Sequence, residues 1–510
     1  MATLVALVLS ACGSSPIVAL EGTSANDAAP RAATSTTLAR STPTNPTASA
    51  PTSAPAPLHD ALVWSSCGKH LQCTRLTVPL DYSGAVPGTI ALYVKRHPAS
   101  SSARLGSMLV NPGGPGIPGT TLVDAAEGEF STDIVDRFDI VGWDPRGTGR
   151  STPAIQCAPD LDPYFSLDPS PDDPAEMQAL EDASKDFAAT CARSSGDLLA
   201  HVSTQDSARD MDAIRAALGE DTITYFGFSY GSFLGATFAT MFPQSVRAMV
   251  VDGAEDPAGN TADAAIAQAS SLERSLDLVL AGCSKNKKCP FYNGGDAEGA
   301  FDRLMAKLDT DPISVSSKRP KVGQGVALFA VISQLYSKAM WPTLLKGLAK
   351  AQAGDGALLL AMYDGYLERR SDGSWSNVFP ALAAINCVDD PGITDKAGMD
   401  ALAPRYLAAA PHLGAQLVYN FTCSYWPAER VARLALTAAG AGPIVVIGTT
   451  GDPITPLPSS AAMASALKQG VLVTVEGEQH TGYGLDDCIV TTIDHYLIDL
   501  VPPQPGLVCK

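Results

Sequence analysis

The stretch TYFGFSYGSFLG, from Thr224 to Gly235, places Ser229 between Gly227 and Gly231. The residues before the serine are typical of a short strand. The apolar run SFLGATFATMF after it is typical of a helix that ends before Pro243. A serine held between two glycines at such a junction predicts a turn that is too tight for side chains on either side.

A G-x-S-x-G pattern at a strand-to-helix junction predicts a nucleophile elbow, in which a strained turn exposes the serine Oγ. A serine hydroxyl is a poor nucleophile until a base takes its proton, so Ser229 needs a histidine. His480 follows a predicted strand in VTVEGEQHTGYG, and Asp452 follows another in IVVIGTTGDPITP. The order Ser229, Asp452, His480 is that of the α/β hydrolases, whereas a simple glycine-rich turn would need no such partners.

Acyl transfer also requires N–H donors for the oxyanion of the tetrahedral intermediate. One is expected on Tyr230, the residue after the nucleophile. The other is expected in the early loop of MLVNPGGPGIPG, where three glycines allow the backbone to approach a substrate closely. Gly114 is favoured as this second donor, with Gly113 as the alternative, and an ordinary Pro/Gly turn is the competing interpretation.

Strand-like and helix-like runs alternate before residue 257 and after residue 441, which predicts a mostly parallel sheet covered on both faces. The segment between them is mostly helical. The expected organisation is an α/β-hydrolase fold with a large helical cap inserted between the nucleophile half and the Asp/His half. Its parts are a signal peptide with a lipobox (1–22), a Ser/Thr/Pro-rich tether (23–58), the first part of the core (59–256), the cap (257–441) and the second part of the core (442–510).

Composition bounds the partners of this 510-residue chain. The net charge of −18 argues against a nucleic-acid partner, because binding nucleic acid requires a surface rich in Lys and Arg. The start, MATLVALVLSACGSS, reads as a secretory signal, and Cys12 after Leu-Ser-Ala resembles a bacterial lipobox. The alternative is a cleaved signal in which Cys12 has no role. The sequence therefore predicts an exported protein, either a cell-envelope lipoprotein or a secreted enzyme, that contacts the membrane only through a lipid anchor.

The chain has eleven cysteines, and ten remain when Cys12 is set aside. An even number in an exported chain argues for disulfide bonds. A zinc site is disfavoured because there is no Cys-x-x-Cys motif and no clustered histidine, so neither a metal nor an organic cofactor is implied. Four pairs are close in sequence and the last two cysteines remain for each other, which gives Cys67–Cys73, Cys157–Cys191, Cys283–Cys289, Cys488–Cys509 and Cys387–Cys423.

The motifs VNPGGPG, FDIVGWDPRGTGRS, GFSYGS, VVDGAEDP, AINCVDD, CSYWP and GDPITP…HTGYG occur in this order. Together they resemble the secreted tripeptidyl-aminopeptidase-like α/β hydrolases of actinobacteria, which are relatives of proline iminopeptidase and include mycobacterial lipoprotein serine proteases. The resemblance spans about residues 64–510. It implies the catalytic set Ser229, Asp452 and His480 and a peptide as the substrate.

The expected function is therefore that of an exported serine exopeptidase that releases short peptides from free N-termini. Such an enzyme needs a carboxylate for the substrate amine, and Glu255 or Asp389 is expected to supply it, each beside a second acidic residue, Asp256 or Asp390. The same triad would also serve a carboxylesterase, a lipase or an endopeptidase. A non-catalytic binding protein is disfavoured because it need not retain all three residues.

Overall fold

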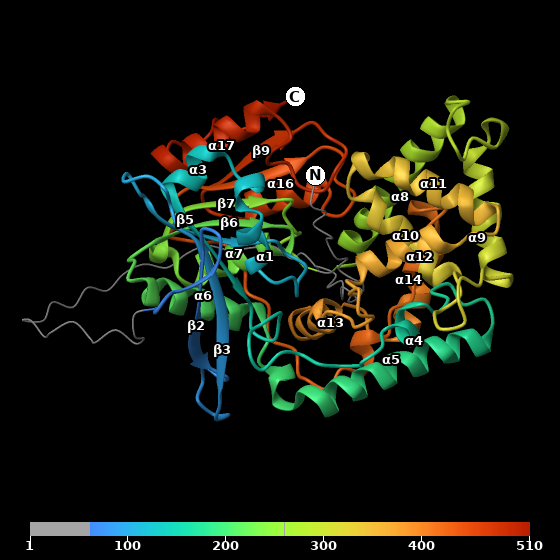
Figure 1. Cartoon of the computed structure of the whole chain (residues 1–510), viewed down its shortest axis with the longest axis horizontal. Coiled ribbons are helices and arrows are strands. Elements are labelled where there is room, and N and C mark those ends of the chain that lie inside the picture. Colours follow the sequence, from blue (N-terminus) through green and yellow to red (C-terminus); the bar gives the residue numbers. More distant parts are fainter. Residues whose placement is uncertain (1–61, 260, 391) are drawn as a thin grey trace, which may run out of the picture.

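The computed structural model describes residues 62–259, 261–390 and 392–510, so the signal, Cys12 and the tether lie outside the described residues. Within these ranges, ten strands form one sheet (Figure 1). The strands are β1 (Ser65–Gly68), β2 (Leu71–Pro79), β3 (Thr89–His97), β4 (Gly106–Asn111), β5 (Phe138–Asp144), β6 (Ile223–Phe228), β7 (Val246–Asp252), β8 (Ile444–Thr449), β9 (Gly470–Val475) and β10 (Val508–Cys509).

The order across the sheet is β1-β2-β3-β5-β4-β6-β7-β8-β9-β10. The pairs from β1 to β5 are antiparallel, and every pair from β5 through β4 to β10 is parallel. The expected mostly parallel α/β sheet is thus confirmed. Strands β6 and β8 are buried along their whole length because helices cover both of their faces.

Alternate residues of the strands supply two hydrophobic cores. Leu109, Tyr225 and Val446 face a core shared with α6 (Thr204–Leu218), α7 (Tyr230–Met241) and α16 (Leu457–Ala466). Their neighbours in sequence, such as Val110 and Val445, face the other core. That second core is completed by α1 (Thr120–Asp124), α2 (Ala126–Glu129), α3 (Thr132–Arg137) and α17 (Asp487–Asp499). The period of two is the one a pleated strand imposes.

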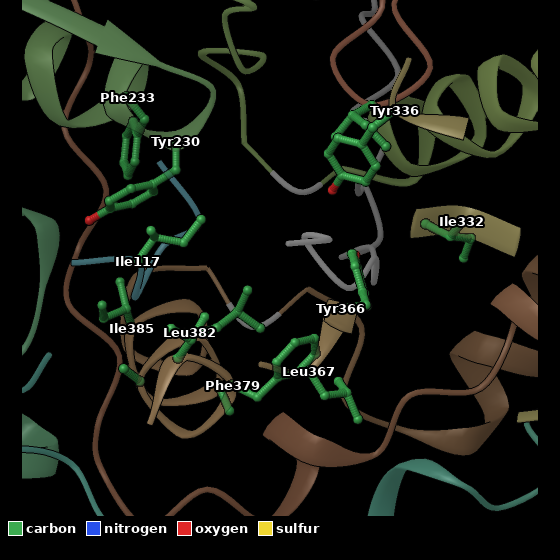
Figure 2. Packing of buried hydrophobic residues seen from close by; sticks show 14 of the residues in the cluster. Ile117, Tyr230, Phe233, Ile332, Tyr336, Tyr366, Leu367, Phe379, Leu382 and Ile385 are labelled. Atoms are coloured by element: carbon green, nitrogen blue, oxygen red, sulfur yellow. The ribbon is translucent and has the colours of Figure 1, made fainter. Parts of the chain in front are cut away.

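A body of helices lies beside the carboxyl ends of the central strands and forms the cap (Figure 1). Between β7 and β8 it comprises α8 (Ala262–Lys285), α9 (Ala297–Thr310), α10 (Gln324–Leu335), α11 (Trp341–Gln352), α12 (Ala357–Tyr366), α13 (Val378–Asp389), α14 (Lys396–Ala409), α15 (Gly414–Leu417) and the short 3-10 helix η5 (Thr422–Tyr425). Helix α13 packs against the loop after β4, since a Cβ added at Gly116 would lie 2.6 Å from the Val378 carbonyl oxygen. Figure 2 shows Leu382 and Ile385 of this helix beside Ile117 and Tyr230 of the core.

A second segment of chain joins the cap from within the first half of the core. It carries α4 (Asp162–Phe165) and α5 (Pro174–Ser195), and α5 runs along the cap in Figure 1. Arg319 of the cap forms an ion pair with Asp162 at 3.1 Å, and Lys185 lies 4.9 Å from the ring centroid of Tyr425 in η5. The division of the sequence into parts, which assigned residues 59–256 to the core, therefore does not follow the packing at α4 and α5.

Five disulfide bonds are present, and they join the same five pairs that the sequence analysis expects: Cys67–Cys73, Cys157–Cys191, Cys283–Cys289, Cys387–Cys423 and Cys488–Cys509. The Cys387–Cys423 bond ties α13 to η5 within the cap. Over the described residues, none of the helices combines the length and the apolar character needed to cross a bilayer.

Candidate active site

Ser229 occupies the sharp turn between β6 and α7. Its φ of 55° lies in the left-handed region, which a non-glycine residue adopts only under strain. A Cβ added at Gly227 would lie 2.4 Å from the Gly231 carbonyl oxygen, and one added at Gly231 would lie 2.8 Å from that of Asn111. Neither glycine can therefore be replaced by a residue with a side chain, because its Cβ would clash with a backbone oxygen. This is the physical reason for the G-x-S-x-G spacing.

The structure brings Asp452 and His480 together on neighbouring loops, after β8 and β9. His480 Nδ1 lies 2.8 Å and 2.9 Å from the two carboxylate oxygens of Asp452. Asp452 Oδ1 also accepts hydrogen bonds from the backbone N–H groups of Ile454 and Thr455, each at 2.8 Å. These bonds fix the carboxylate, and the carboxylate in turn fixes the tautomer and direction of the imidazole.

The other ring nitrogen, Nε2 of His480, is buried and forms no hydrogen bond to any described residue, Ser229 included. The ring nevertheless lies beside the nucleophile turn. A Cβ added at Gly253 would be 3.1 Å from His480 Cε1. The backbone carbonyl oxygen of the preceding residue, Asp252, accepts the Ser229 N–H at 2.8 Å. Catalytic hydrogen bonds are often long without substrate and shorten in the complex, so this arrangement suits a general base.

The loop after β4 packs directly against the turn. A Cβ at Gly113 would lie 2.6 Å from the Phe228 carbonyl oxygen and 2.9 Å from Ser229 Cβ. The Gly113 N–H donates to Asn111 Oδ1 at 2.9 Å, whereas no described residue accepts a bond from the N–H of Gly114 or Tyr230. Of the two glycines, Gly114 therefore has the N–H that is available to an oxyanion.

The four acidic candidates for amine recognition meet in one pocket of about 90 Å³ where the cap meets the core. Asp390 is neutralised by Arg433, whose Nη1 lies 3.0 Å from its carboxylate. Asp256 Oδ1 accepts the N–H of Ala258 at 2.8 Å and so caps its own turn. Asp389 is also hydrogen-bonded within the protein, to Thr204, but neither Asp389 nor Glu255 has an ion-pair partner among the described residues, and these two remain the candidates for the substrate amine.

Glu255 and Asp389 are half-buried, and burial raises the pKa of each to about 7. The side chain of Glu255 makes no hydrogen bond or ion pair with any described residue. The carboxylate of Asp389 lies at the first turn of α6, where it accepts the backbone N–H of Thr204 at 3.0 Å and its hydroxyl at 2.6 Å. Thr204 Oγ1 is also hydrogen-bonded to the Tyr230 hydroxyl.

Two polar residues that shape the site, Asp252 and Thr455, were not identified from the sequence. Asp252 is buried and accepts the backbone N–H groups of Gly482 and Tyr483 at 2.7–3.0 Å, so it anchors the loop that carries His480. Thr455 Oγ1 donates to Asp452 Oδ2 at 3.0 Å and lies 3.2 Å from His480 Nδ1. Asp252 is the last residue of β7, and nothing in the local sequence VVDG distinguishes it from other acidic residues.

Comparison with known proteins agrees with this geometry. The family described as alpha/beta hydrolase fold matches residues 106–486. The chain belongs to this family. The serine protease Hip1 of Mycobacterium tuberculosis is 37% identical over 458 residues, which cover 86% of this chain and 87% of that protein. The resemblance drawn from the motifs is thereby confirmed.

Two further relatives are similar over a comparable length. Carboxylesterase B of Mycobacterium tuberculosis is 35% identical over 473 residues, with 88% of this chain and 89% of that protein covered. The tripeptidyl aminopeptidase of Streptomyces lividans is 29% identical over 464 residues, with 85% and 84% covered. These relatives thus carry both peptidase and esterase names.

Proposed function

We propose that the protein is an exported serine exopeptidase that releases short peptides from free N-termini through an acyl-enzyme on Ser229. The observation that carries this proposal is a pocket with two carboxylates, Glu255 and Asp389, beside the nucleophile turn. A serine hydrolase of the peptidase type is supported by the Hip1 and tripeptidyl aminopeptidase relatives. The free N-terminus and the short product are inferred from the carboxylate pocket.

In the proposed mechanism, Ser229 Oγ attacks the scissile carbonyl carbon while His480 Nε2 takes its proton. The N–H groups of Gly114 and Tyr230 donate to the oxyanion that forms. His480 then gives the proton to the departing amine. A water molecule next attacks the acyl-enzyme while His480 takes its proton, and His480 passes that proton to Ser229 Oγ as the acyl product leaves. Asp452 holds the imidazole in the tautomer with its proton on Nδ1 and stabilises the imidazolium.

The substrate amine is proposed to lie between Glu255 and Asp389 as an ammonium ion. The path from Ser229 to Asp389 runs along one tyrosine side chain and two hydrogen bonds, through Tyr230 and Thr204. An extended peptide covers about 3.3–3.6 Å per residue, so a few residues span this path. A short N-terminal peptide is therefore the proposed product.

Export rests on the N-terminal sequence. Cys12 is proposed to become the lipidated first residue, and residues 23–58 would tether the enzyme to the membrane surface. The five disulfide bonds of the described residues fit an oxidising compartment.

The second candidate function is that of a carboxylesterase. It is favoured by the 35% identity to carboxylesterase B, and it would use the same triad without an ammonium ion. An esterase has no ammonium ion to place between Glu255 and Asp389, although Asp389 would still accept the hydrogen bonds of Thr204. This difference makes the two candidates separable by substrate.

A panel of three substrate types tests the proposal: free-amine tripeptide amides, their N-acetylated counterparts and a small acetate ester. We expect the free-amine peptides to be cleaved with the highest kcat/KM. Glu255→Gln or Asp389→Asn should lower kcat/KM for them about 10- to 100-fold, while the ester is little affected. Equal cleavage of acetylated and free peptides by the wild-type enzyme would overturn the exopeptidase proposal.

Ser229→Ala provides the matched control for the nucleophile. This variant should lose turnover of all three substrate types and covalent labelling by a serine-directed phosphonate, with an unchanged circular dichroism spectrum. Labelling that persists in Ser229→Ala would show that another serine is the nucleophile.

A further inference from the structure

An apolar pocket of about 200 Å³ lies inside the cap, between the α4–α5 segment and the helices α10 and α13. Its walls are mainly large apolar side chains, among them Phe165, Leu180, Leu328, Phe329, Phe379 and Leu382. Phe165, Leu180 and Phe329 are only half-buried although they belong to the interior of the cap. Their remaining exposure faces an open space rather than a packed core.

Three phenylalanines form an edge-to-face wall of this pocket. The ring centroids of Phe165 and Phe379 are 5.3 Å apart, those of Phe165 and Phe329 are 6.0 Å apart, and those of Phe329 and Phe379 are 6.1 Å apart. All three pairs are T-shaped, which is a favoured geometry for aromatic contact. A cavity of about 150 Å³ with an apolar lining is large enough for benzene, so this pocket can hold an aromatic ring.

The apolar pocket adjoins the carboxylate pocket. Both are lined by Ala265, Gln268, Asn386 and Asp390. Asp389, which we assign to the substrate amine, is the next residue to Asp390 at the end of α13. A group held at Asp389 therefore lies at the boundary between a charged and an apolar compartment.

One polar atom of the apolar pocket has no partner. Gln416, which is 7% exposed, donates through Nε2 to Gln324 Oε1 at 2.8 Å. Its own Oε1 is buried and accepts no hydrogen bond from any described residue. A buried acceptor without a donor is costly, and a ligand with an N–H or O–H group would satisfy it.

We propose that the cap pocket binds the aromatic side chain of the first residue of the substrate. The α-amine and the side chain of that residue leave the same carbon atom, so two adjoining compartments, one acidic and one apolar, can take one each. The inference rests on the proposed function and deepens it: the enzyme selects peptides that begin with Phe, Tyr or Trp. The acceptor of Gln416 favours the hydroxyl of Tyr or the indole N–H of Trp over Phe.

The test compares tripeptide amides that differ only in the first residue, namely Ala, Leu, Phe, Tyr and Trp. Full burial of a large apolar side chain favours binding enough that kcat/KM for the Phe substrate should exceed that for the Ala substrate at least about tenfold. Gln416→Leu should remove the preference for Tyr over Phe and leave the preference for Phe over Ala.

Two variants fill the pocket from opposite walls. Ser184 of α5 and Ala383 of α13 both line it, and neither belongs to the catalytic or amine-binding residues. Ser184→Phe, and Ala383→Leu should the first variant fold poorly, are expected to abolish the preference for an aromatic first residue. Ala189→Phe is the matched control, because Ala189 is exposed on the same helix α5 and does not line the pocket.

The readout is the ratio of kcat/KM between Phe and Ala substrates, with ester hydrolysis as the measure of an intact triad. We expect this ratio to fall to about one in the filled variants and to keep its wild-type value in Ala189→Phe. If the wild-type enzyme cleaves all free-amine peptides equally well, the pocket assignment is wrong while the proposed function stands. If it cleaves esters but no free-amine peptide, both are wrong.

Discussion

Thr455 is the residue that connects the two members of the Asp–His pair. Its hydroxyl donates to Asp452 Oδ2 and also lies 3.2 Å from His480 Nδ1. A hydrogen bond to a charged group contributes about 1.5–3 kcal/mol, and the hydroxyl keeps the carboxylate from turning away from the imidazole. The geometry of the base thus depends on a side chain outside the triad.

We therefore predict that Thr455→Val lowers kcat about tenfold or more and leaves KM nearly unchanged. Thr450→Val is the matched control, since the Thr450 hydroxyl bonds to the backbone of Gly477 and not to the triad. Steady-state kinetics and the rate of phosphonate labelling would both report the loss. An unchanged kcat in Thr455→Val would show that Asp452 needs no support from this hydroxyl.

A pH dependence follows from the two carboxylates of the amine pocket. Burial raises the pKa of Glu255 and Asp389 to about 7, with Arg433 and His480 opposing the shift in Glu255 and Thr204 and Arg433 opposing it in Asp389. A carboxylic acid carries its charge above its pKa, so the pocket loses negative charge as pH falls through 7. Recognition of an ammonium ion must then weaken on the acidic side.

We expect the kcat/KM for free-amine peptides to fall more steeply between pH 7 and pH 6 than that for a small ester, because the substrate amine, with a pKa of about 7.7–8.0, is already largely protonated in that range while the two carboxylates lose their charge. The ester profile serves as the internal reference, because both substrates depend on the protonation state of His480. In the double variant Glu255→Gln/Asp389→Asn the two profiles should become parallel. Parallel profiles in the wild-type enzyme would contradict the role of these carboxylates.

Some residues of the site could be predicted from sequence and others could not. Ser229, Asp452 and His480 stand in a fixed order on loops after apolar strands, so local pattern and order together single them out. Asp252 acts through hydrogen bonds to residues that are 230 or more positions away in the chain, which no local pattern marks, and the contact of Thr455 with His480 depends on how two loops meet. The ion pair of Asp390 with Arg433, which excludes Asp390 as the group that binds the substrate amine, could not be predicted from the sequence either.

At the scale of elements, α13 combines several tasks. Its end carries Asp389, and Phe379 and Leu382 line the cap pocket. Its backbone lies on the oxyanion loop, since a Cβ at Gly116 would be 2.6 Å from the Val378 carbonyl oxygen. A displacement of this one helix would therefore change the amine site, the pocket and the contact with the oxyanion loop together.

The Cys387–Cys423 bond holds this helix, and its removal is a direct test. It spans 36 residues, and in the chain-entropy view its replacement by two alanines should lower the free energy of unfolding by about 3–4 kcal/mol. Because Cys387 is two residues from Asp389, kcat/KM for peptides should fall more than that for the ester. Urea unfolding and the two assays provide the measurements.

Removal of the Cys67–Cys73 bond is the control for that experiment. This bond spans six residues on β1 and β2, at the edge of the sheet. We expect a smaller loss of stability and an unchanged ratio of peptide to ester activity. An equal effect of both removals on that ratio would mean that α13 does not depend on its disulfide bond for its position.

The strands and most helices were predictable because their apolar periodicity is local. Whether α4 and α5 pack with the sheet or with the cap could not be predicted from the sequence. An apolar stripe shows that a helix packs on something, but the same stripe serves a sheet or another helix. Contacts in the folded structure, such as those of Asp162 with Arg319 and of Lys185 with Tyr425, show that this segment packs against the cap.

At the scale of the whole molecule, the proposed anchor determines where the enzyme acts. Cys12→Ser should release the protein from the cell envelope into the medium, because a single residue would carry the lipid. Cell fractionation with an antibody to the protein measures this, and Ser10→Ala, which keeps the cysteine, is the control. A wild-type protein found entirely in the medium, with its first residue beyond position 12, would overturn the lipobox assignment.

The construction of the cap from two separate stretches of chain has a consequence for protein engineering. The wall of the apolar pocket combines Phe165 and Leu180, from before the nucleophile, with Phe329 and Phe379, from after it. A chimaera that exchanged residues 257–441 between two relatives would join one half of a pocket to the wrong half. To transplant a substrate preference, four junctions have to be cut instead of two, and the donor's version of α4 and α5 has to move with the rest.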